Sequence, residues 1–143
     1  MLLHRVTAAV IAPLVLVAVS LLSPAAAAGL SAEWAGAYGY EDGRPAVPFV
    51  LTLTENGAVI TGRIDEVQTF GTRSSDDKLG ASVVGSVNGH VVTFTKTYDG
   101  KGGQTHSVRY HGTLVVDGEF KFMFGTWRLG NDVGSWFATI AKD

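Results

Sequence analysis

Alternation of apolar and polar side chains with a period of two runs through the chain from Gly29 onward, without helical periodicity of useful length. The segment 48–54, PFVLTLT, places Phe49, Leu51 and Leu53 on one face and two threonines on the other. Such alternation is typical of β-strands that bury one face. We therefore expect an all-β protein.

Tight turns divide this region into eight expected strands. Glu55-Asn56-Gly57 and Asn88-Gly89 fit tight hairpin turns, because Asn-Gly tolerates the positive φ angles that such turns need. Asp117-Gly118 fits a third turn. The expected strands cover residues 34–40, 48–54, 58–66, 79–87, 90–98, the stretch around 106–111, 119–129 and 134–141.

Connections between near neighbours predict a single-domain, eight-stranded antiparallel up-and-down β-barrel, with a β-sandwich as the alternative. Closure leaves no unpaired edge strand in a chain for which we expect no helix to cover one. The 18 glycines suit the sharp bends and crowded interior of a small barrel. An outer-membrane barrel would need an apolar outward face on every strand, whereas segments 49–54 and 91–97 carry threonine-rich faces. We expect a water-soluble barrel.

The first 28 residues differ in composition from the rest of the chain. His4 and Arg5 precede an apolar run over residues 8–22, and the small residues SPAAAA follow it. This three-part pattern predicts a secretory signal peptide; the run is short for a membrane anchor, the alternative. We expect residues 1–28 to be cleaved near Ala28, and residues 29–143 to form a secreted or periplasmic barrel domain without membrane association.

Charge and cysteine content exclude several classes of function. Thirteen acidic residues oppose eleven basic ones, of which Arg5 lies in the predicted signal peptide, so nucleic acid is not an expected partner. The chain has no cysteine, which removes disulfides, thiolate metal ligands and a cysteine nucleophile. We expect no cofactor.

Neither a metal site nor a catalytic set is predicted. His106 and His111 are five positions apart, so on a strand they point to opposite faces. His106 and Ser107 are adjacent, and therefore cannot form a nucleophile–base pair directly. Catalysis by a barrel enzyme is the weaker alternative to binding, and we assign no catalytic residue.

Several motifs resemble, in their order along the chain, those of one protein family. They are WAGAY at 34–38, GAVITG at 57–62, TFTKTY at 93–98, THS at 105–107 and GTWRL at 125–129. Together they resemble the avidin/streptavidin-like, calycin-type family of secreted β-barrels. The resemblance implies an up-and-down barrel with a ligand pocket, and association of barrels through their outer faces.

The same resemblance implies that biotin is not the ligand, because the family's polar clamp on the first and third strands is not retained. The positions that correspond to the clamp are Gly36, Ile64 and Glu66. Phe94 replaces a wall tryptophan, and Arg109 replaces a threonine beside the ligand's tail. The positions that match the family as they stand are Ser107 and Trp127.

Aromatic residues occur on nearly every expected strand, where they either fill the barrel or line a pocket at one open end. Phe94 and Lys96 share one strand face, and Ser107 and Arg109 share one face of the next strand. If both faces point the same way, they form a wall suited to a small acidic or aromatic ligand; otherwise one face is exterior. The predicted ligand-binding residues are Phe94, Lys96, Ser107, Arg109 and Trp127.

Two functions therefore stand as hypotheses. The first is binding of a small ligand, which requires an open-ended cavity that touches Phe94 or Trp127. The second is a protein-interaction or structural role through the outer barrel face, with a homo-oligomer as one form. Large apolar side chains on the outer face of the last three strands, above all in Phe120–Phe124, would favour the second.

Overall fold

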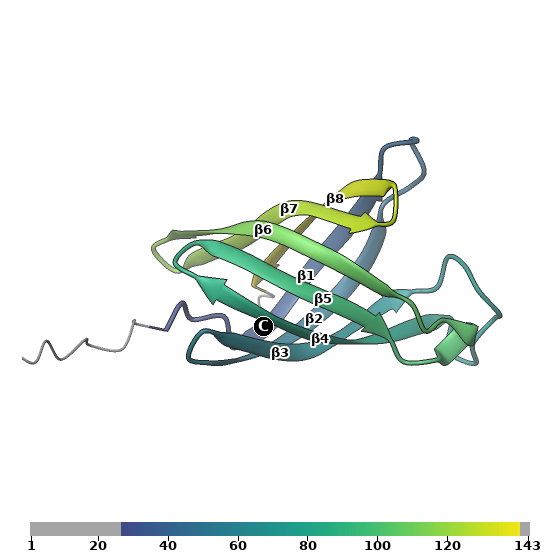
Figure 1. Ribbon diagram of the computed structural model, residues 1–143, viewed down its shortest axis with the longest axis horizontal. Coiled ribbons are helices and arrows are strands. Elements are labelled where there is room, and N and C mark those ends of the chain that lie inside the picture. The colour runs from purple at the N-terminus through teal and green to yellow at the C-terminus, as the bar shows by residue number, and fades with distance from the viewer. Residues whose placement is uncertain (1–26, 141–143) are drawn as a thin grey trace, which may run out of the picture.

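Eight antiparallel strands close into a barrel in a computed structural model that describes residues 27–140. Each strand pairs with the next along the chain, and the last pairs with the first (Figure 1). The strands are β1 (Ala32–Tyr40), β2 (Val47–Asn56), β3 (Val59–Val67), β4 (Lys78–Asn88), β5 (Val91–Tyr98), β6 (Ser107–Asp117), β7 (Phe120–Leu129) and β8 (Asp132–Ile140). The predicted up-and-down barrel is confirmed, and closure excludes the sandwich.

Residues 1–26 of the predicted signal peptide, and Ala141 at the predicted end of the last strand, lie outside the described residues. Within residues 27–140, the only helical element is a 3-10 turn, η1 (Lys101–Gly103), and no helix is long and apolar enough to span a membrane.

Hairpin chemistry places the two ends of the barrel. The turn between β2 and β3 pairs Asn56 with Val59, and Gly57 adopts a φ of 61° that glycine tolerates without strain. Figure 1 shows this hairpin at the same end as the β4–β5 and β6–β7 hairpins and the N-terminal segment. The four remaining connections, β1–β2, β3–β4, β5–β6 and β7–β8, lie at the opposite end. We call the first the hairpin end and the second the loop end.

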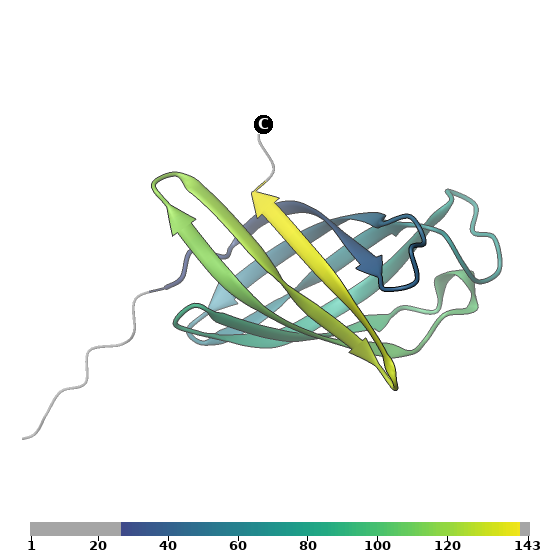
Figure 2. The ribbon, with the colours of Figure 1, turned by 90° about the horizontal axis from the view of Figure 1, so that it is seen from above.

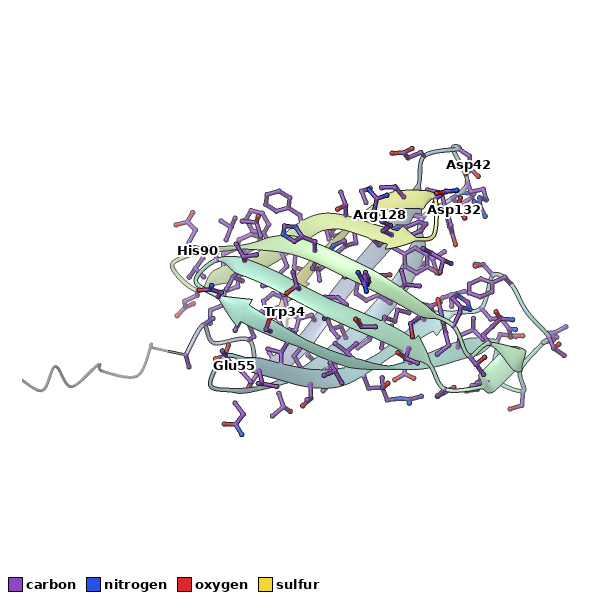
Figure 3. The ribbon with its side chains drawn as sticks, in the orientation of Figure 1. Trp34, Asp42, Glu55, His90, Arg128 and Asp132 are labelled. Carbon is purple, nitrogen blue, oxygen red and sulfur yellow. The ribbon has the colours of Figure 1, made fainter. Side chains whose placement is uncertain are left out.

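The hairpin end is filled by apolar side chains and closed by the segment that precedes β1. Leu30 and Trp34 are fully buried, and the Trp34 indole Nε1 donates a hydrogen bond of 3.0 Å to the Leu30 carbonyl. Figure 3 shows Trp34 among the strands toward this end. The buried residues that strands contribute here are Ile60, Val87, Val92, Leu114 and Met123. The barrel is therefore solid at the hairpin end.

An aromatic layer crosses the middle of the barrel. Gly112 and Gly125 pair across β6 and β7, and a side chain on Gly112 would come within 2.5 Å of the Trp136 ring. The missing side chain makes room for Trp136, whose ring centroid lies 5.5 Å from that of Phe94 and 5.6 Å from that of Tyr110. This layer separates the apolar residues that fill the hairpin end from the interior of the loop end.

Candidate ligand-binding site

A cavity of about 520 Å³ opens at the loop end of the barrel. This volume lies in the range of about 300–1,000 Å³ that is usual for small-molecule sites. Its walls are predominantly apolar, and the aromatic and imidazole rings that line it are Tyr38, Tyr40, Phe70, Tyr98, His106, Tyr110 and Trp127. The arrangement is a pocket with one open mouth, because the other end of the barrel is packed solid.

One side of the mouth is formed by the β1–β2 and β7–β8 connections. The Arg44 guanidinium lies 3.7 Å from the Tyr40 ring centroid and forms a 2.7 Å ion pair with Asp42. Hydrogen bonds from Arg44 hold the pKa of the Asp42 carboxyl below its ordinary value. Figure 3 shows Asp42 and Asp132 at this mouth. Both partners of the ion pair are exposed, so it orients Arg44 over Tyr40 but adds little stability.

The other side of the mouth is formed by the β3–β4 and β5–β6 loops, which are bonded to each other. The Thr72 amide donates to the Gly102 carbonyl (2.9 Å), and the Gln68 side-chain amide donates to the carbonyls of Phe70 (3.0 Å) and Thr72 (2.7 Å). These bonds hold the Phe70 ring 5.7 Å from that of Tyr98, at the cavity wall. The two glycine-containing loops therefore flank the barrel mouth.

Two tyrosines of the cavity lining and two charged residues behind them form a buried quartet (Tyr38, Glu66, Lys96 and Tyr98). Glu66 is 2% exposed and Lys96 is 1% exposed, and Lys96 Nζ forms an ion pair with Glu66 Oε2. Glu66 Oε1 accepts hydrogen bonds from the hydroxyls of Tyr98 (2.6 Å) and Tyr38 (3.1 Å). Lys96 Nζ also donates to the Tyr98 hydroxyl oxygen at 2.8 Å.

Burial sets the protonation of the tyrosines in this region. It raises the pKa of the Tyr38 and Tyr98 hydroxyls far above the ordinary value, and the negative charge of Glu66 adds to the shift. Burial raises the pKa of Tyr110 in the same way. Burial also lowers the pKa of the Lys96 ammonium, and Glu66 opposes that shift. The three tyrosines are therefore neutral, and none of them supplies a phenolate base.

The structure separates the five predicted ligand-binding residues into two groups. Phe94, Lys96 and Trp127 point into the barrel and are buried, whereas Ser107 and Arg109 are exposed on its outer face. The register of β5 and β6 accounts for this separation. Lys96 pairs with Val108, so both point inward, whereas Ser107 and Arg109 on either side of Val108 point outward. The condition that both strand faces share one wall is therefore not met.

Only one member of the inward group lines the cavity itself. Trp127 is part of the wall, and its indole Nε1 donates to the Gly39 carbonyl at 2.9 Å. Phe94 lies beneath the lining, stacked on Tyr110 at 4.7 Å between ring centroids. Lys96 is held behind the rings of Tyr38 and Tyr98. The open-ended cavity that the ligand hypothesis requires is therefore present, and it touches Trp127.

The outward group and the histidines follow the alternation of β6. Ser107 Oγ shares a 2.8 Å hydrogen bond with Thr97 Oγ1 on the outer face, and Arg109 pairs with Arg128 of β7. His111 is exposed on that face, whereas His106 lines the cavity, as their odd spacing predicted. Among residues 27–140 no cluster of His, Asp and Glu is arranged to hold a metal ion.

Sequence reasoning missed the quartet as a unit. The inward series of β5 reads Val92, Phe94, Lys96 and Tyr98, and that of β3 reads Ile60, Gly62, Ile64 and Glu66. Each of these otherwise apolar series contains one charged residue, Glu66 in β3 and Lys96 in β5, and these two charges are the sequence signal from which the quartet could have been predicted. Because an unpaired buried charge is very costly, two such charges of opposite sign predict a buried pair.

Comparison of the chain with protein-family models, with curated proteins and with solved structures finds no match. The assignment of a function therefore depends on the geometry of the barrel and of its cavity.

Proposed function

We propose that this protein is an exported β-barrel that binds a small ligand other than biotin in the cavity at its loop end. The observation that carries the proposal is the aromatic-lined cavity, open at one mouth and closed by the packed hairpin end. Apolar walls with a few convergent polar groups are the usual composition of small-molecule sites. The signal-peptide pattern of residues 1–28 supports export to a secreted or periplasmic location.

The residues at the family's biotin-clamp positions support a different ligand. A side chain on Gly36 would come within 2.7 Å of the Phe49 ring, so this position has no room for a polar clamp residue. Glu66 is fully engaged in the buried quartet. Arg109, at the position beside the biotin tail, is outside the barrel.

Replacement of two exposed alanines by tryptophan, one at the cavity mouth and one at the far end, tests whether the cavity holds the ligand. Ala46 is an exposed residue of the β1–β2 loop that lines the mouth, and Ala58 is an exposed residue of the β2–β3 hairpin at the far end. In a native mass spectrum of protein purified from its own host, we expect a retained small molecule in the wild type and in Ala58→Trp. We expect Ala46→Trp to lose it, because the indole fills the mouth. Equal retention in both variants would place the ligand elsewhere, and a bare wild type would contradict the proposal.

The outer face of β7 and β8 favours a second candidate function, association with another copy of the chain. Phe120 is 53% exposed, Phe124 is 46% exposed and Phe137 is 53% exposed. Phe124 and Phe137 pair across the two strands, which with β6 form one continuous wall of the barrel (Figure 2). Contiguous exposed aromatic side chains of this kind are typical of interaction surfaces. This role is compatible with a ligand inside the barrel.

A further inference from the structure

The buried quartet determines the hydrogen-bonding role of two side chains that line the cavity, Tyr38 and Tyr98. A carboxylate can only accept hydrogen bonds, so the bonds from Tyr38 and Tyr98 to Glu66 use the one hydroxyl hydrogen that each tyrosine has. An ammonium can only donate, so the bond from Lys96 to Tyr98 uses one lone pair of that hydroxyl oxygen. Both hydroxyls therefore have no hydrogen left to donate.

The lone pairs that remain on the two hydroxyl oxygens can act only as hydrogen-bond acceptors. Tyr98 keeps one lone pair and Tyr38 keeps two, and both residues line the cavity. Trp127 offers no free donor either, because its indole N–H is bonded to the Gly39 carbonyl. Tyr110, whose hydroxyl makes no hydrogen bond within residues 27–140, is the tyrosine of the inner wall that can adapt to either kind of partner.

The charge of the site favours a neutral occupant. The charges of Glu66 and Lys96 already balance each other, and the three tyrosines are neutral. A ligand that carried a further charge to the depth of the quartet would lose hydration without meeting an unpaired opposite charge there, because the other charged residues that line the cavity, Arg44 and Asp132, lie at its exposed mouth. The surrounding rings instead offer flat apolar surface, which packs against aromatic molecules in stacked or edge-on contact.

From these three steps we propose that the cavity selects neutral, planar aromatic or heteroaromatic molecules that carry an N–H or O–H donor, and that the donor bonds to the hydroxyl oxygens of Tyr38 and Tyr98. Glu66 and Lys96 act as positioning residues, because they orient both hydroxyls without lining the cavity. This inference rests on the proposed ligand-binding function and adds the chemical class of the ligand to it.

Indole and benzofuran test the selection, because they share a shape and differ in having an N–H or an ether oxygen at one ring position. We measure the dissociation constant of each from amide chemical shifts of ¹⁵N-labelled protein, with the amides of Tyr40, Phe70 and His106 reporting on the mouth. We expect indole to bind about tenfold more tightly, because benzofuran leaves buried acceptors without a donor. Equal dissociation constants for the two probes at the mouth would contradict the proposed selectivity for a donor group but would still support the cavity as a binding site. Absence of binding by both would contradict the pocket as well.

Variants then separate the role of the quartet from that of the walls. In Tyr38→Phe one acceptor is removed, and in the double variant Glu66→Leu/Lys96→Met both tyrosine hydrogens are released to become donors. We expect the preference for indole to fall in Tyr38→Phe and to reach within about threefold of parity in the double variant, since the hydroxyls can then donate to the benzofuran oxygen. Ser107→Ala, on the outer face, is the control that should keep the wild-type ratio. A ratio that stays at the wild-type value in the double variant would remove the quartet from the mechanism.

Discussion

Lys96→Met is expected to lower the free energy of unfolding by about 3–5 kcal/mol, the usual cost of removing one partner from a buried ion pair. Glu66 is 2% exposed, so its carboxylate would stay buried without a counter-charge, held only by the Tyr38 and Tyr98 hydroxyls. Tyr98 would also lose the hydrogen bond that it accepts from Lys96. Urea denaturation followed by tryptophan fluorescence measures the loss directly.

The double variant Glu66→Leu/Lys96→Met is the decisive comparison. Replacing a buried ion pair by apolar residues of similar volume is often neutral or stabilising, so we expect the double variant to recover most of the stability that Lys96→Met loses. Lys78→Met, at an exposed position in β4, should have an effect within about 0.5 kcal/mol and controls for the loss of a lysine as such. A double variant as unstable as the single one would show that these side chains matter through packing rather than through their charges.

Strong coupling between the two residues would have a functional meaning. If an apolar pair supports the barrel as well as the ionic pair does, stability alone does not account for two buried charges in its interior. What the charges provide is the fixed direction of two hydroxyl hydrogens, since both point at Glu66 Oε1. The stability measurement and the indole–benzofuran comparison thus examine the same quartet through independent readouts.

The strands and their closure follow from local features of the sequence. Alternation marks which residues of a strand share a face, and the tight turns after Asn56 and Asn88 set the register of neighbouring strands through the two-residue loops 57–58 and 89–90, each of which begins with a glycine at positive φ. In β4 and β5, for example, the loop of Gly89 and His90 pairs Asn88 with Val91 and thereby aligns the inward series of both strands. Closing the sheet removes its unpaired edge strands and therefore favours a barrel, which is the observed fold.

The position of Ser107 and Arg109 shows where this reasoning ends. The β5–β6 connection is long and irregular, with Gly100 at positive φ before the 3-10 turn and Gly102 at positive φ within it, so no turn rule transfers the register from β5 to β6. The apolar series Val108, Tyr110, Gly112 and Leu114 nevertheless marks the inward face, and polar residues occupy the other. The prediction of Ser107 and Arg109 as binding residues followed their polar side chains, which lie on the solvated face. The loop-end cavity is instead lined largely by apolar and aromatic residues, with the Glu66–Lys96 ion pair behind them.

Replacing Phe124 and Phe137 by serine is expected to weaken self-association of the barrel by at least about 100-fold, because burial of one phenylalanine side chain contributes about 1.5–3 kcal/mol. The two residues are register partners across β7 and β8, and with Phe122, whose ring centroid lies 5.9 Å from that of Phe124, they form an aromatic stripe on the outer face. Sedimentation velocity at a series of protein concentrations should show the wild type shifting from monomer to dimer, and Phe124→Ser/Phe137→Ser remaining monomeric.

Both substituted positions are about half exposed, so the double variant should unfold at nearly the same urea concentration as the wild type, and a change in association can be read without a change in folding. Val84→Ser is the matched control, because Val84 is 59% exposed on β4, away from the aromatic stripe. If Val84→Ser weakens the dimer equally, the contact lies on another wall of the barrel. If the wild type stays monomeric at every concentration, the outer face does not bind a second copy. Its exposed phenylalanines would then require a partner of another kind, and the cavity would remain as the site that the structure favours for function.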